Sequence, residues 1–199
     1  GESFTFRFEA TDPGVFMYHC GTKPVLAHIA NGMYGAIVVD PATPLPKADR
    51  EYVLVAGEWY LSGPGTDTPA GLDMAKARAM EPDWTAFNGY AGQYVQHPLT
   101  ADPGDLVRFY VVDAGPSLTT AFHVVGTVFD TVYLNGDMDP ARAQHGVQTV
   151  DVPAGGGAVF EVKIDEPGLY PFVSHAFAHV DLGQVGLLKV GKPRGPATH

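Results

Sequence analysis

The sequence contains little cysteine, little positive charge and no long apolar run. A single cysteine among 199 residues excludes a disulfide framework within the chain. Lysine and arginine together number 12 against 22 acidic residues, which gives a formal net charge of -10. An acidic chain without basic clusters does not attract nucleic acid or an anionic membrane surface. No apolar stretch approaches the roughly 18 residues that cross a bilayer, so we expect neither a nucleic-acid partner nor a membrane-spanning segment.

Helical periodicity is also scarce, and residues 72–80 form the one convincing helical stretch. Elsewhere strand-like runs follow one another, and Phe4, Phe6 and Phe8 alternate with polar residues in the first of them. Turn sequences such as Asp102-Pro-Gly104 separate the runs at the spacing of a β-sandwich. The pattern predicts an all-β fold, with strands over residues 3–9, 15–20, 35–40, 51–61, 84–88, 105–112, 121–125, 131–134, 147–152, 158–164, 169–173 and 186–190.

A proline-rich segment from Pro41 to Pro46 divides the chain into two unequal parts. Proline interrupts strand continuation, so this segment indicates a linker between a domain over residues 1–45 and a second over residues 46–199. The second part has enough strands to close a sandwich, whereas the first does not. Because the chain opens at Gly1 without a methionine, we expect additional strands upstream to complete the first domain.

The most informative chemistry surrounds Cys20. His28 follows it by eight positions and Met33 by thirteen. Thiolate, imidazole and thioether are ligands of a blue copper site, in which the methionine sulfur binds weakly along the axis. A second imidazole completes such a site, and no residue at a matching position supplies it here. We expect that ligand from an upstream segment, and electron transfer is the natural chemistry of the site.

His19 directly precedes Cys20, and successive side chains on a strand point to opposite faces. We therefore expect Cys20 to face its own lobe and His19 to face outward, so that the two neighbours serve different metals. A weak internal repeat places His175 after a second Pro-Gly turn, at the position that corresponds to His19. With His123 on a neighbouring strand, these imidazoles form a set that leaves a coordination position open to substrate.

Three segments resemble copper-containing nitrite reductases, and the resemblance covers nearly the whole chain. The first resembles the type 1 copper segment of that family, and the other two resemble segments of its second domain. They are Tyr18-His-Cys-Gly-Thr-Lys-Pro-Val-Leu-Ala-His28-Ile-Ala-Asn-Gly-Met33-Tyr-Gly-Ala-Ile-Val-Val-Asp-Pro41, Ala114-Gly-Pro-Ser-Leu-Thr-Thr-Ala-Phe-His123-Val-Val-Gly126 and Pro167-Gly-Leu-Tyr-Pro-Phe-Val-Ser-His175. The resemblance implies tandem cupredoxin-like Greek-key β-sandwiches, of which the first is incomplete in this chain.

The same resemblance implies two copper sites. Cys20, His28 and Met33 would bind type 1 copper. His19 and His175 would bind type 2 copper at a subunit interface of a homotrimer, where neighbouring subunits each supply ligands. The remaining histidine ligands and a catalytic aspartate of the family would lie upstream of Gly1.

The implied reaction is the reduction of nitrite to nitric oxide and water with one electron and two protons. The electron would pass from type 1 copper through Cys20 and His19 to type 2 copper. His123 would match the active-site histidine that helps deliver protons, and an imidazole suits that task because it titrates near neutral pH. The resemblance further implies a small electron-donor protein, either a cupredoxin or a cytochrome c, and an extracytoplasmic location that is periplasmic, cell-surface or secreted.

Two other functions compete with this interpretation. A laccase-like multicopper oxidase needs paired histidines for a trinuclear cluster, and the chain has no His-x-His motif, although the segment from His175 to His179 resembles the final motif of those oxidases. A non-catalytic blue-copper electron-transfer protein would need only the ligand set around Cys20 and would leave His175 without a metal. The role of His179 stays open in each case.

Overall fold

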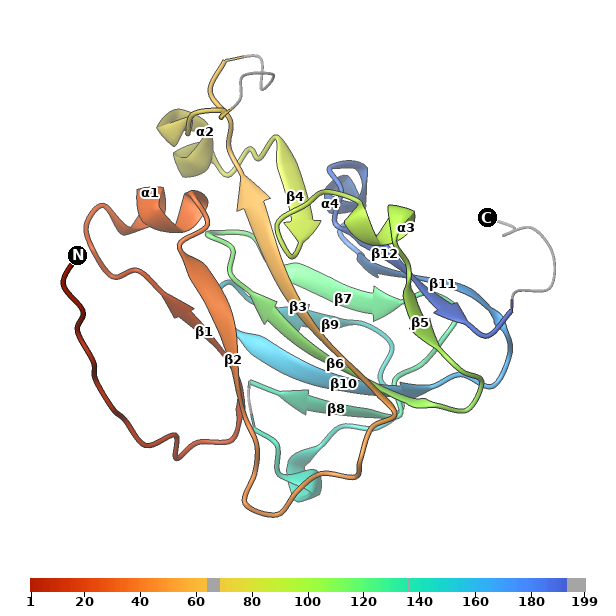
Figure 1. Cartoon of the computed structure of the whole chain (residues 1–199). Helices are drawn as coiled ribbons and strands as arrows, with labels where there is room; N and C mark the ends of the chain where they lie inside the picture. Colours follow the sequence, from red (N-terminus) through yellow and green to blue (C-terminus); the bar gives the residue numbers. More distant parts are fainter. Residues whose placement is uncertain (64–68, 136, 193–199) are drawn as a thin grey trace.

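Two five-stranded sheets make up most of the protein, as the computed structural model shows over residues 1–63, 69–135 and 137–192 (Figure 1). The first sheet contains β3 (Arg50–Trp59), β4 (Trp84–Phe87), β6 (Leu106–Asp113), β8 (Thr131–Leu134) and β10 (Gly157–Lys163). The second contains β5 (Leu99–Ala101), β7 (Thr120–Val124), β9 (Val150–Val152), β11 (Gly168–Ser174) and β12 (Val185–Val190). Their strand orders are β4-β3-β6-β10-β8 and β5-β12-β11-β7-β9. Both sheets are mixed, because β3 runs parallel to β6 and β12 runs parallel to β5.

The expectation of a predominantly β protein is confirmed, and most expected strands lie within a few residues of the observed ones. β5 was not expected, since a strand of so few residues shows no alternation of apolar and polar side chains. β9 begins at Val150 rather than at Val147, which forms only an isolated bridge with Phe129.

Short helices connect the strands. Within the expected helical stretch lies α2 (Met74–Ala79), which begins where the Asp73 carboxylate accepts hydrogen bonds from the amides of Ala75 and Lys76. The sequence did not predict the short helices α1 (Val25–Ala30), α3 (Gln93–Gln96) and α4 (Phe177–Asp181). No helix in the described ranges is long and apolar enough to cross a membrane.

The main core lies between the two sheets and follows from alternation along the strands. On β6, Val107, Phe109 and Val111 point into this core. The ring of Phe109 lies 5.7 Å from that of Phe122 on β7 and 6.0 Å from that of Phe172 on β11, centroid to centroid. Aromatic side chains from both sheets therefore hold the sandwich closed.

The outer face of the first sheet carries a second apolar cluster beneath an N-terminal hairpin of β1 (Gly14–His19) and β2 (Tyr34–Val39). Val15 of β1 is buried there against Tyr110 and Val112, the residues of β6 that alternate with its core-facing ones. A side chain on Gly157 of β10 would begin 2.3 Å from the carbonyl oxygen of Val15. The hairpin and the first sheet thus meet backbone to backbone.

The segment that precedes the hairpin differs from expectation, because residues 3–9 form no strand. Phe4, Phe6 and Phe8 are 88%, 71% and 68% exposed, and their rings stack in sequence at centroid distances of 6.4 and 6.2 Å. A strand needs a hydrogen-bonded neighbour, and no described strand runs beside this segment. The alternation of phenylalanines with polar residues therefore led to a wrong prediction of a strand here, because it carries no information about a pairing partner.

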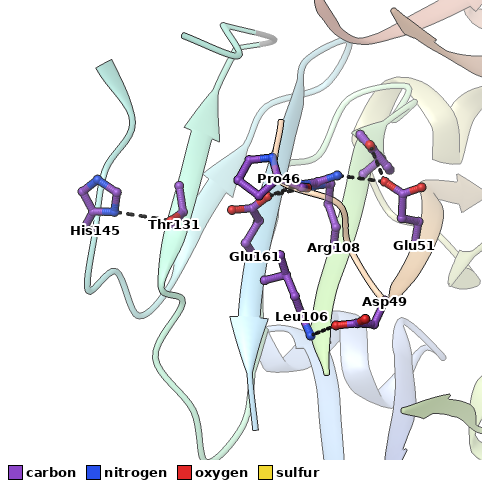
Figure 2. Close-up of polar contacts among 9 residues, drawn as sticks. Pro46, Asp49, Glu51, Leu106, Arg108, Thr131, His145 and Glu161 are labelled. Atoms are coloured by element: carbon purple, nitrogen blue, oxygen red, sulfur yellow. Dashed lines mark hydrogen bonds and ion pairs between the residues drawn. The ribbon is translucent and has the colours of Figure 1, made fainter. Parts of the chain in front are cut away.

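The proline-rich segment after the hairpin is held by an ion cluster around the buried Arg108 of β6 (Figure 2). The guanidinium of Arg108 donates to the Glu161 carboxylate at 2.8 Å, to the Glu51 carboxylate at 2.9 Å and to the carbonyl oxygen of Pro46 at 2.6 Å. Below it, the amide of Leu106 donates to the Asp49 carboxylate at 2.9 Å. The end of the proline-rich segment is therefore fixed to the first sheet.

Gly157→Ala should destabilise the protein, because the new methyl group would collide with the backbone of β1. Overpacking of this kind costs about 1–3 kcal/mol of unfolding free energy, which urea denaturation measures. Gly21→Ala is the matched control, since nothing lies within 4 Å of its added carbon. Equal stability of the two variants would show that the hairpin does not rest on β10 in this way.

Arg108→Met should cost about 3–5 kcal/mol, because it leaves the buried Glu161 carboxylate without its cation. The control is Arg50→Met, whose exposed ion pair with Asp102 should contribute less than about 1 kcal/mol. Chemical denaturation of both variants compares these losses. A loss at Arg108 no larger than that at Arg50 would contradict the assignment.

Candidate metal centre

The loop between β1 and β2 brings the three residues of the expected type 1 site together. Cys20 follows β1 directly, His28 lies on α1, and Met33 precedes β2. The amide of Cys20 donates to the carbonyl oxygen of Met33 at 3.0 Å, and the amide of Met33 donates to that of His28 at 3.2 Å. Backbone hydrogen bonds therefore fix all three Cα positions relative to one another.

The side chains of Cys20 and His28 approach each other closely. The Cys20 Sγ lies 3.3 Å from the His28 Nδ1. A thiolate and an imidazole bound to one metal at about 2.3 and 2.0 Å, with the roughly 120° angle of a trigonal site between them, place their donor atoms about 3.7 Å apart, close to the observed separation. The two side chains thus fit a shared metal ion.

Met33 is 51% exposed. A thioether is a weak axial ligand, so partial exposure is compatible with that role. No second imidazole joins this set within the described residues, because groups of three or more His, Cys, Asp or Glu able to hold a metal ion are absent from those ranges. The expected fourth ligand is not found among them.

His19 is the exposed last residue of β1, while Cys20 is half-buried. The Nδ1 of His19 donates to the carbonyl oxygen of Cys20 at 3.0 Å. This hydrogen bond leaves the Nε2 lone pair free for a metal. The two neighbouring side chains therefore have different surroundings.

His123 and His175 lie next to each other on the second sheet. Because His123 pairs with Val173 across β7 and β11, and His175 follows β11 beside Ala121, both imidazoles occupy the face that points away from the main core. Their ring centroids are 5.3 Å apart. The ring of Phe177 lies 4.8 Å from that of His175 in an edge-on arrangement.

The two imidazoles differ in burial. His175 is exposed, whereas His123 is buried and its Nδ1 donates to the carbonyl oxygen of Gln148 at 2.6 Å. That bond fixes the neutral tautomer in which Nε2 carries the lone pair. A buried, oriented imidazole beside an exposed one suits proton transfer next to a metal ligand. No sequence signal marks Gln148, because its contribution comes from a backbone carbonyl.

A layer of buried polar residues beneath the imidazoles was also not predicted. It closes the end of the main core near α4 and includes Glu58, Thr85, Asp113, Thr120, Ser174 and Gln184. The pKa of Asp113 is raised to about 7, chiefly by burial and in smaller part by the charge of Glu58, while hydrogen bonds from Thr120 and Gly115 act to lower it. These residues are scattered along the sequence, so only the fold reveals that they meet.

Known proteins share both the sequence and this architecture. A family model of multicopper oxidases matches residues 1–43 and 65–194. The copper-containing nitrite reductase of Neisseria gonorrhoeae is 43% identical over 98% of this chain and is matched over 50% of its own length. The solved structure of a copper nitrite reductase from Nitrosomonas europaea is 35% identical with a TM-score of 0.82, over 94% of this chain and 68% of that one. The chain belongs to the copper-containing nitrite reductase family.

A second member of the family extends the comparison. The structure of a copper-containing nitrite reductase from Thermus scotoductus is 32% identical with a TM-score of 0.83, and covers 96% of this chain and 45% of that one. The two mixed sheets accordingly form a cupredoxin-like sandwich. The chain spans about half the length of the curated nitrite reductases that it matches.

Cys20→Ser should abolish the intense visible absorption that a copper-bound thiolate produces when Cu²⁺ is added, because the chain has no other thiol. Absorption spectroscopy of the copper-loaded protein measures it. Thr22→Ser in the same loop is the control and should keep the band. A band that survives in the Cys20 variant would exclude the thiolate as a ligand.

Proposed function

We propose that this chain is the part of a copper-dependent nitrite reductase that holds a type 1 copper in its N-terminal hairpin and contributes to a type 2 copper. The observation that supports the proposal most directly is the 3.3 Å contact between Cys20 Sγ and His28 Nδ1, beside an outward-facing His19. Family membership supports the same substrate, nitrite.

Cys20 and His28, with the thioether of Met33, would hold the type 1 copper. His19 and His175 would hold the type 2 copper, each through an imidazole that reaches the protein surface. When bound, the coppers supply a one-electron donor and a Lewis acid for nitrite. The peptide link between Cys20 and His19 is the shortest covalent connection between the two ligand sets.

His123 would serve the proton side of the reaction. Its Nδ1 is occupied by the carbonyl oxygen of Gln148, so Nε2 is the nitrogen that takes up and releases a proton. Conversion of nitrite to nitric oxide and water consumes one electron and two protons. His123 lies beside His175 at 5.3 Å, within reach of a small anion bound there.

The quaternary arrangement and the location belong to the same proposal. His19 ends β1 and His175 follows β11, and neither belongs to a group of three or more metal-binding side chains within the described residues, which suits a type 2 site completed between subunits of a homotrimer. We further propose tandem cupredoxin domains over residues 1–45 and 46–199, an electron-donor protein that is a cupredoxin or a cytochrome c, and an extracytoplasmic location.

His175→Ala should reduce nitrite turnover to near background, because it removes a ligand of the catalytic metal while leaving the thiolate absorption of the Cys20 site intact. Nitric oxide release with an artificial electron donor measures turnover in the protein that contains this chain. His145→Ala is the matched control, since that exposed histidine lies near Asp130 and Thr131, away from the imidazole pair. An unchanged rate in the His175 variant would overturn the proposal.

A further inference from the structure

Two buried carboxylates hold the loop that leads into β7. Asp113, at the end of β6, accepts hydrogen bonds from the amides of Gly115 at 2.8 Å and Thr120 at 2.7 Å. Glu58 of β3 accepts from the amides of Ser117 at 3.1 Å and Leu118 at 2.6 Å. Residues 114–119 are therefore attached to the sandwich through these carboxyl groups and through backbone hydrogen bonds of Ala114 and Gly115 with β3.

The same carboxyl groups connect to the strand ends that carry the imidazoles. Gln184 donates from its side-chain amide to the Thr120 hydroxyl at 2.9 Å, and its backbone amide donates to the carbonyl oxygen of His179 at 2.8 Å. Next to this connection, the amide of His175 donates to the carbonyl oxygen of Ala121 at 2.6 Å. The contacts of Asp113 thus extend through Thr120 to both strands of the imidazole pair.

One buried acceptor in this layer has no partner. The Oε1 of Gln184 makes no hydrogen bond, although Gln184 is 3% exposed. It lines a narrow space together with Asp113, Glu58, Thr85 and Thr120, and this space has no room for a water molecule. A buried acceptor left without a donor costs free energy comparable to a lost hydrogen bond, so a donor is expected within the layer.

The hydroxyl groups of Thr85, Thr120 and Tyr60, which lie in or next to this layer, already make hydrogen bonds to other partners. Thr85 donates to the carbonyl oxygen of His179 at 2.7 Å, and the Thr120 hydroxyl is bonded to the Asp113 carboxylate. The Tyr60 hydroxyl donates to Glu58. The titratable groups that line the space are the carboxyl groups of Asp113 and Glu58 and the imidazole of His179, whose Nδ1 lies 3.3 Å from the Ser174 hydroxyl. Of these, Asp113 is the group whose pKa burial raises to about 7.

We infer that Asp113 retains a proton at neutral pH, donates it to Gln184, and acts as a positioning residue for β7 and the His123–His175 pair. Burial raises the pKa of Asp113 to about 7, which agrees with this geometry. The importance of Asp113 for nitrite reduction rests on the proposed function. The protonation of Asp113 at neutral pH does not depend on that function.

The surroundings of Asp113 oppose its ionisation. The titratable groups that face it are Glu58 from β3, Tyr34 from β2 and His179 from α4, with Tyr60 behind Glu58. No lysine or arginine lines the space among the described residues. Ionisation would place a second negative charge beside Glu58, so the loop and the start of β7 should loosen as pH rises through the pKa of Asp113.

The sign of the pH effect follows from proton binding. Between the pKa of an unfolded aspartate, about 4, and that of Asp113 in the fold, about 7, the folded chain holds a proton that the unfolded chain lacks. The free energy of unfolding therefore falls as pH rises across this window and levels off above it. The Asp113→Asn variant has no titratable side chain at this position, so its free energy of unfolding should not show this decrease between about pH 4 and pH 7.

The direct experiment follows the side-chain carboxyl carbons of aspartate-labelled protein by NMR from pH 4 to pH 9, without copper or nitrite. We expect the Asp113 carbon to titrate near pH 7. Asp113→Asn should remove the high-pH titration, while the control Asp151→Asn should leave it unchanged. Amide protection factors at Thr120, corrected for intrinsic exchange, should fall severalfold above pH 7 in the wild type and in Asp151→Asn, but not in Asp113→Asn.

Two results would overturn the inference. One is an Asp113 carbon already ionised at pH 6, and the other is protection at Thr120 that does not change across the titration of Asp113. The wild-type titration decides between these outcomes even where the Asn variant does not fold. Since neither measurement involves turnover, a lack of nitrite reduction would contradict the proposed function alone.

Discussion

Successive side chains of a strand point to opposite faces, and this constraint places the functional residues that lie on β6 and β7. On β6 it sends Asp113 into the sandwich and Arg108 toward the linker, five positions apart on the same strand. On β7 it sends Phe122 into the aromatic core and His123 away from it. The sheets therefore form the packed core and also separate core-facing side chains from the polar side chains on their other faces.

The buried ionisable groups of the protein are stabilised in two different ways. Arg108 is neutralised by Glu161 and Glu51, so that ion pairs offset the lost hydration of the cluster. Asp113 and Glu58 have backbone amides but no cation, and burial raises the pKa of Asp113 as a result. The first arrangement fixes the linker under all ordinary conditions, whereas the second depends on a proton.

Much of the candidate site could be predicted because it is local in sequence. Cys20, His28 and Met33 lie within one hairpin loop, and their residue types limit the metal to one with soft ligands. The polar layer beneath the imidazoles could not be predicted in this way, since Glu58 and Gln184 come from distant strands and neither has an unusual neighbour in the sequence. The strand expected over residues 3–9 shows the same limit, because its pairing depends on a neighbour rather than on its own alternation.

By itself, the sequence determined the β character of the chain and the residue types gathered around Cys20, because periodicity and side-chain chemistry are properties of short segments. The tertiary structure alone decided which distant residues meet: the 5.3 Å approach of His123 and His175, the ion cluster of Arg108 and the shared layer of Asp113 and Gln184. Such meetings depend on strand register and on the packing of one sheet against another, and a one-residue change of register would turn each of these side chains to the other face.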